Sequence, residues 1–163
     1  METLKFPAGT VVSLQLCLRH EEPLRPTDRV VAIPGAGLEG DVHGTDGRGS
    51  PRQVLLIDTT TLDSLGLRPG DLREQVTLDL PRLQALPPGT RLRIGEATFE
   101  LTGPCAPCGH IGELLGAEDV EAFRESLSGR RGVLARVVEA EGEGRIRVGD
   151  PVDVVIPTTG GRT

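Results

Sequence analysis

Hydrophobic and polar residues alternate near the start of the chain. The apolar positions are Val12, Leu14, Leu16 and Leu18, and the positions between them are Ser13, Gln15, Cys17 and Arg19. A period of two residues is typical of a strand that buries one face. The pattern therefore predicts a half-buried strand in which Cys17 lies on the polar side.

Short apolar runs that favour strands recur along the rest of the chain. They cover residues 30–33, 53–57, 75–80, 90–94, 98–101, 133–139, 145–148 and 152–156. Glycine and proline supply turn signals between them, most clearly at residues 87–89, 95–96, 141–144 and 149–151. Many short strands at close spacing are typical of antiparallel barrels, since closure removes exposed sheet edges. We predict a mainly β fold (β-rich α+β), built as a closed or partly closed antiparallel β-barrel.

Two segments predict helices. Asp58 is a suitable N-cap for the first, and Gly66 is a suitable C-terminal stop. The second covers residues 111–127, where the apolar positions 114, 115, 120 and 123 allow one buried stripe. Gly112 and Gly116 weaken this second helix. We therefore expect one or two short helices beside the barrel.

The length of 163 residues is that of one domain. We place the domain at residues 1–157. The glycine-rich residues 158–163 are predicted to form a flexible C-terminal tail.

Charge and hydropathy exclude several classes of partner. The net charge is −6 and Trp and Tyr are absent, which disfavours nucleic-acid binding through basic stripes and stacking aromatics. No apolar run approaches the length of a membrane span, and residues 1–7 lack a signal-peptide pattern, so we expect a cytoplasmic protein with no membrane partner. Lys5 is the sole lysine and lies near the terminus, so we expect no pyridoxal phosphate held as a Schiff base.

The pattern G-x-G-x-x-G occurs at residues 35–40, after an apolar run. It binds dinucleotide phosphates when a helix follows and directs its N-terminus at the anion. The residues that follow, from Asp41 to Gly47, are typical of turns. We therefore interpret the match as a coincidence.

Cysteine chemistry concentrates at Cys105-Ala106-Pro107-Cys108, between a predicted strand and the second predicted helix. A zinc site would need completion by His110, His43 or Cys17. A thioredoxin-like redox pair would need a βαβ context that the pattern does not predict. Two ordinary loop cysteines are a third interpretation. A single reactive thiolate, with the second cysteine as a helper, is the interpretation we favour, since thiolates bind soft metals and carry sulfane sulfur.

Several motifs, in order along the chain, resemble those of the MOSC domain family, named for the C-terminal part of molybdenum cofactor sulfurases. They are Gly40-Asp41-Val42-His43, Leu72-Arg73-Glu74-Gln75-Val76-Thr77, the strand at residues 88–95, the segment from Glu100 to Cys108, Arg130-Arg131-Gly132-Val133 and the hairpin at residues 146–152. Together they span residues 30–155. One departure is Gln75, which stands where the family usually has asparagine.

The resemblance implies a barrel that binds the molybdenum cofactor, a pterin dithiolene ending in a phosphate, and handles sulfur or metal through one cysteine. Cys108 matches the cysteine that ligates molybdenum in the family's reductases, and it is our candidate catalytic residue and metal ligand. Cys105 matches a cysteine found in some members. Arg130 and Arg131 are candidates to hold the cofactor phosphate.

The remaining candidate residues come from the first two motifs. Gly40, Asp41 and His43 are expected to line the pocket, with His43 as a proton donor; a turn at residues 40–41 with a capping His43 is the alternative. Arg73 and Glu74 are expected to form an ion pair near the cofactor, or else a surface pair of little energetic weight.

Two function classes follow from these residues. The first is a sulfur-handling cofactor-binding protein, supplied by a sulfur donor such as a cysteine desulfurase. The second is a molybdenum-dependent reductase of N-hydroxylated substrates, supplied by a separate electron-transfer protein because the chain lacks the cysteines for an iron–sulfur cluster. A zinc-stabilised binding module is a third.

Overall fold

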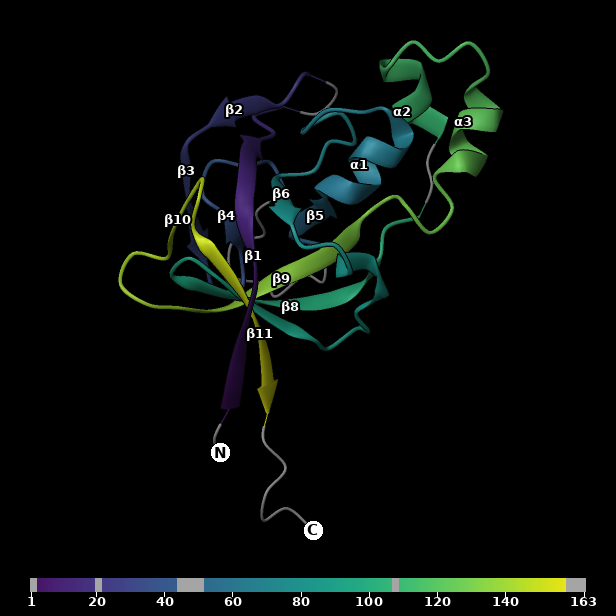
Figure 1. The fold of residues 1–163 in the computed structure, drawn as a ribbon. Coiled ribbons are helices and arrows are strands. Elements are labelled where there is room, and N and C mark those ends of the chain that lie inside the picture. Colours follow the sequence, from purple (N-terminus) through teal and green to yellow (C-terminus); the bar gives the residue numbers. More distant parts are fainter. Residues whose placement is uncertain (1–2, 20–21, 44–51, 107–108, 158–163) are drawn as a thin grey trace.

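The computed structural model describes residues 3–19, 22–43, 52–106 and 109–157. Its described strands include seven that close into a barrel (Figure 1). In order around the barrel they are β1 (Thr3–Leu16), β11 (Pro151–Pro157), β7 (Arg91–Ile94), β8 (Ala97–Pro104), β9 (Val133–Ala140), β5 (Val54–Asp58) and β6 (Val76–Asp79). The long strand β1 closes the ring, because it pairs with both β11 and β6. The predicted closed barrel is therefore confirmed.

The expectation of a wholly antiparallel barrel is wrong at one junction. Strands β5 and β6 pair in parallel, with Leu56 opposite Val76 and Asp58 opposite Leu78. A parallel pair needs a crossover rather than a hairpin. Here the connection contains helix α1 (Thr59–Leu65) and the loop that leads to Arg73. The loop carries a predicted motif, so the parallel junction also positions candidate site residues.

Four shorter strands lie beside the barrel. Strand β2 (Arg25–Thr27) pairs with β1, while β10 (Arg145–Arg147), β3 (Arg29–Ile33) and β4 (Gly37–Leu38) form a three-stranded sheet. The G-x-G-x-x-G segment covers part of the turn between β3 and β4, strand β4 itself and the turn that follows, and Gly35 and Gly37 take positive φ. It forms a hairpin rather than a phosphate loop, in agreement with its interpretation as a coincidence.

The barrel interior is aliphatic apart from Phe99, which is fully buried. Its fully buried leucines and isoleucine include Leu14, Leu56, Leu78, Leu92, Ile94 and Leu101. Burying side chains of this size stabilises the fold by roughly 1.5–3 kcal/mol each. The interior is therefore the main source of the stability that supports a polar site elsewhere.

Three α-helices occur in the described ranges, rather than one or two, together with the 3-10 turn Leu83–Ala85. Helix α1 begins and ends as predicted: the Asp58 carboxylate accepts from the Thr61 N–H, and Gly66 closes the helix with φ of 68°. The single helix predicted at residues 111–127 is instead α2 (Gly109–Leu114) and α3 (Val120–Ser126). Gly116, at φ of 72°, interrupts it, and Asp119 caps a new helix.

The predicted facing of residues 12–19 is wrong at four positions. Val12 and Leu18 are exposed, whereas Gln15 and Cys17 are buried; Leu14 is buried as predicted. A register shift in the β1–β6 pairing, between Val11 and Ser13, interrupts the alternation at Val12. Cys17 follows the end of β1, and its buried N–H donates to the Asp41 carboxylate.

No described helix is both long and apolar enough to cross a membrane. The predicted tail at residues 158–163 lies outside the described residues. Strands β1 and β11, near the two ends of the chain, run side by side (Figure 1).

Candidate functional site

A cavity of about 230 Å³ brings together residues from most of the predicted motifs. We call it the arginine cavity. Its lining residues are His43, Arg52, Gln53, Leu55, Arg73, Gln75, Cys105, Ile111, Arg131 and Leu134. They come from the turn after β4, from β5 and the residues before it, from the segment before β6, from the residue after β8, from α2, and from β9 and the segment before it. The site therefore exists only once the barrel has closed.

The Asp41 carboxylate organises one side of this cavity. Its side chain is 1% exposed, and Oδ2 accepts from the Cys17 N–H at 2.7 Å. Its Oδ1 accepts from the His43 N–H at 2.9 Å and contacts His43 Nδ1 at 2.8 Å. Burial by itself raises the pKa of Asp41, but the hydrogen bonds from His43 and Cys17 outweigh it, so the pKa lies below the usual value. The carboxylate is therefore an acceptor.

An acceptor at this position selects one tautomer of His43. Because the ionised Asp41 can only accept, neutral His43 carries its proton on Nδ1 and its lone pair on Nε2. Asp41 and His43 form a tight turn, and His43 lines the arginine cavity. Gly40 belongs to the turn, with φ of 85°, and is exposed rather than among the lining residues.

Gln75 connects this turn to the barrel wall. Its Oε1 accepts from the Leu55 N–H of β5 at 2.8 Å, and its Nε2 donates to Asp41 Oδ1 at 3.2 Å. The longer glutamine side chain thus contacts the strand and the carboxylate at the same time. Gln75 is buried and supports the orientation of His43 through Asp41.

Arg73 and Glu74 are adjacent in the chain, but their described bonds go to different partners. Arg73 takes φ of 62°, the left-handed region that L residues rarely occupy. Its Nη1 donates to the Glu22 carbonyl at 2.7 Å, and its Nη2 donates to Cys17 Sγ at 3.3 Å. The expected ion pair with Glu74 does not form among these contacts.

Glu74 is fully buried instead of lying on the surface. Its Oε2 accepts from the Gly70 N–H and the Thr77 hydroxyl, both at 2.7 Å. Burial raises the pKa of Glu74, and these hydrogen bonds offset the rise only in part. Glu74 is buried in the protein interior and is not among the described residues that line the arginine cavity.

The cysteine segment contacts the Arg130-Arg131-Gly132-Val133 motif in another part of the cavity wall. The Cys105 N–H donates to the Gly132 carbonyl at 2.9 Å, and Cys105 is partly exposed. Arg131 is 7% exposed and lines the arginine cavity, whereas Arg130 is half-buried and does not line it. Cys105 and Arg131 also line a neighbouring cavity of about 190 Å³. Cys108, our candidate metal ligand, lies outside the described residues.

Sequence reasoning missed Gln53 and Arg52 as residues of the cavity lining. Gln53 is 1% exposed, and its Oε1 accepts from the Val137 N–H of β9 at 2.9 Å. Within the described ranges its Nε2 has no hydrogen-bond partner. A polar residue at the start of a wholly buried strand was the available signal, because burial of an amide requires a specific partner.

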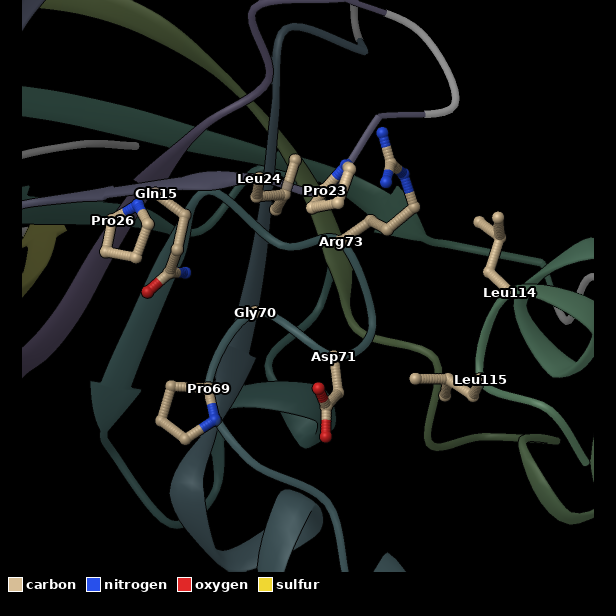
Figure 2. A pocket seen from close by; sticks show the side chains of 10 residues that line it. All are labelled: Gln15, Pro23, Leu24, Pro26, Pro69, Gly70, Asp71, Arg73, Leu114 and Leu115. Atoms are coloured by element: carbon tan, nitrogen blue, oxygen red, sulfur yellow. The ribbon is translucent and has the colours of Figure 1, made fainter.

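A larger cavity of about 280 Å³ lies on the other side of Arg73 (Figure 2). Figure 2 shows Pro23 and Leu24 on one side of it, and Leu114 of α2 and the following Leu115 on the other. Of the predicted site residues, Arg73 alone is in its described lining. Across the described residues, no three His, Cys, Asp or Glu side chains lie close enough to hold a metal ion.

Comparison with solved structures identifies the same fold in other proteins. The YuaD protein from Bacillus subtilis superposes with a TM-score of 0.76 at 19% identity, covering 96% of this chain and 99% of YuaD. YiiM from Geobacillus stearothermophilus gives 0.68 at 18% identity, covering 94% of this chain and 77% of YiiM. YiiM from Escherichia coli gives 0.61 at 16%, covering 91% and 71%. These identities support the fold alone.

Comparison by sequence adds the family. A search of curated proteins finds no match. The family model of the MOSC domain matches residues 39–153, which include the Asp41 turn, the cysteine segment and the Arg131 motif. Since that match covers well over half of the sequence and the barrel agrees with it, this chain belongs to the MOSC domain family.

Proposed function

We propose that this chain binds the molybdenum cofactor at the arginine cavity and handles sulfur through its cysteine segment. The observation that carries the proposal is the convergence of three arginines, His43 and a cysteine on one cavity. The net charge of the whole chain is −6, so this concentration of arginine is local. Anionic ligands are favoured where positive groups gather in a partly enclosed site.

The residues fit the chemistry of the cofactor. Arginine holds phosphate through paired N–H donors in a planar fork, and Arg131 offers such a fork from a buried position. Gln53 adds a buried amide nitrogen that lacks a partner in the described structure. Thiolates are suitable ligands for soft metal centres, and the cysteine segment supplies Cys105 at the wall.

We assign roles on this basis. Cys108 is the thiolate that ligates molybdenum or carries a persulfide, with Cys105 as its helper. Arg131 holds the cofactor phosphate, and Arg130 supports it from the same turn. When bound, the cofactor supplies a metal centre that can accept sulfur or exchange an oxygen atom. The sulfur comes from a separate donor such as a cysteine desulfurase.

A second candidate function is reduction of N-hydroxylated substrates, with electrons from a separate redox protein. The Asp41–His43 contact at 2.8 Å favours it, because a carboxylate that orients a histidine prepares the ring for proton transfer. In that reaction the protonated form of His43 would donate its Nε2 proton to the leaving hydroxide and return to the neutral tautomer. The positioning of His43 by Asp41 and Gln75 is consistent with either function.

Elemental analysis and intact-mass measurement test the proposal on protein made in a host that synthesises molybdenum cofactor. We expect near-stoichiometric molybdenum in the wild type, a loss in Cys108→Ser, and a reduced content in Arg131→Gln. Arg147→Gln is the matched control, because Arg147 is exposed on β10 and lies outside the cavity lining.

The outcomes separate the alternatives. Molybdenum together with turnover of hydroxylamine-type substrates favours the reductase. A mass increase of one sulfur that depends on Cys108, without metal, favours the sulfur carrier. Full molybdenum in Cys108→Ser contradicts ligation by that residue, and stoichiometric zinc in place of molybdenum favours the zinc-stabilised module.

A further inference from the structure

Arginine side chains supply most of the charged groups of the arginine cavity. Arg52, Arg73 and Arg131 line it, and no carboxylate is among its lining residues in the described part of the chain. The nearby Asp41 carboxylate accepts from the Cys17 N–H and from His43. A ligand that fits this wall carries several acceptor oxygens and negative charge.

Gln53 further restricts which ligands fit the arginine cavity. Its amide is oriented by the bond from the Val137 N–H to Oε1, which assigns the other end of the amide as the nitrogen. This Nε2 is buried and has no acceptor among the described residues. A buried donor without a partner costs about 1–3 kcal/mol. An oxygen of a bound anion would remove that cost, so Gln53 points to an oxyanion rather than to an apolar ligand.

The same cavity contains a nucleophile at its wall. Cys105 is partly exposed, and its backbone is held against Gly132 by the 2.9 Å hydrogen bond. Arg131, the residue before Gly132, lines the same two cavities as Cys105. A cysteine and a buried arginine therefore lie in the wall of the same cavity.

We propose that the arginine cavity binds small oxyanions that carry a transferable sulfane sulfur, of which thiosulfate is the simplest, and that Cys105 accepts this sulfur. The inference rests on the proposed sulfur-handling function and names the class of its sulfur donor. A cavity of about 230 Å³ equals the volume of roughly seven or eight waters, which accommodates a tetrahedral dianion of this size.

The transfer balances without an added oxidant or reductant. The Cys105 thiolate attacks the outer sulfur of thiosulfate, forming a new S–S bond. The S–S bond within thiosulfate breaks, and sulfite leaves with its electron pair. The thiol proton goes to solvent, and the products are a Cys105 persulfide and sulfite.

The arginines act on the main barrier to this step. A thiolate and a dianion repel each other, and the repulsion is strong where water is excluded. Guanidinium groups reduce that repulsion and stabilise the charge that develops on the leaving sulfite. Gln53 would hold one oxygen of the anion, so the outer sulfur is left for Cys105.

The test uses the full-length chain, reduced and purified from a host that lacks molybdenum cofactor synthesis. It is incubated with thiosulfate, sulfite release is measured, and the modified cysteine is mapped by mass spectrometry of peptides. We expect one added sulfur on Cys105 with matching sulfite, both abolished in Cys105→Ser and Cys105→Ala. Arg131→Gln and Gln53→Leu should each raise the half-saturating thiosulfate concentration about tenfold, while Arg147→Gln leaves it unchanged.

Each result decides the proposal. Sulfur on Cys108 or Cys17 in the wild type overturns the assignment to Cys105. Folded wild-type protein that releases no sulfite overturns the donor class, even if the molybdenum measurements support the proposed function. Mapping on the wild type needs no variant to fold, and a thermal unfolding scan verifies the fold of each variant that is used.

Discussion

The barrel interior and the arginine cavity share a strand, but apolar side chains fill the interior whereas polar and charged side chains join apolar ones at the cavity. In β5, Leu56 packs in the aliphatic core, while Leu55 lines the cavity. Just before that strand, Gln53 is as deeply buried as its apolar neighbours, yet it is polar. The core gains free energy from burial alone, whereas each buried polar group at the cavity needs a partner to offset its desolvation. The stability of the barrel therefore offsets the free-energy cost of burying polar groups at the cavity.

The largest effect should come from the interior. Phe99→Ala removes a fully buried ring and leaves a void, so we expect it to lower the free energy of unfolding by about 3–5 kcal/mol. Urea unfolding followed by circular dichroism measures the change. A loss below about 1 kcal/mol would contradict the view that the interior supplies most of the stability.

Removing the Asp41 carboxylate should lower the free energy of unfolding by less than Phe99→Ala does. Asp41→Ala leaves the Cys17 N–H and the His43 ring without their acceptor, and we expect a loss of about 1–3 kcal/mol. Because the folded-state pKa of Asp41 is lowered, its ionised form contributes stability above the ordinary value of 3.8 and loses that contribution as the pH falls through the folded pKa. The stability difference between wild type and Asp41→Asn should shrink below pH 3.8. A difference that stays constant there would count against a charged Asp41.

Glu74 should show the opposite dependence on pH. Its folded-state pKa is raised, so its stability contribution is fully present below the ordinary value of 4.5 and is lost as the pH rises through the folded pKa. Glu74→Gln keeps the shape of the side chain and removes the charge. We expect the variant to gain on the wild type as the pH rises, by on the order of 1 kcal/mol. The unfolding midpoints of the wild type and of Glu74→Gln are compared at about pH 4 and about pH 8. If the difference between the two midpoints is the same at both pH values, the result contradicts a raised pKa for Glu74.

The smallest loss of stability is expected for the Arg136–Glu100 pair on the outer wall of the barrel. Arg136 donates to Glu100 across β8 and β9 at 2.6 Å and 3.1 Å, and this hydrogen bonding lowers the pKa of Glu100. Both side chains reach solvent, which screens the pair. Arg136→Gln should therefore cost less than about 1 kcal/mol, decreasing as salt is added. A larger, salt-independent loss would mean that the wall contributes more than its exposure indicates.

The sequence predicted the barrel because strand periodicity and turn residues act locally. The capped helix between Asp58 and Gly66 was predicted for the same reason: its cap and its stop lie within nine positions of each other. Local signals failed where two tendencies competed. Residues 111–127 carry a helical stripe, but Gly116 and Asp119 divide it into two helices. The alternation at residues 12–18 failed at Val12, where a register shift interrupts it, and at Gln15 and Cys17, which are buried with hydrogen bonds to Glu74 and Asp41.

The sequence by itself determined the aliphatic core, most of the strands, the family and the residues from which a site can be built. Tertiary structure alone decided which of those residues meet. It placed Arg131, Arg73 and Arg52 around one cavity, excluded Arg130 and Glu74 from its lining, and introduced Gln53. The physical reason is that strand patterns depend on neighbours two residues apart. The cavity depends instead on barrel closure and on the parallel β5–β6 junction, which join segments far apart in the chain.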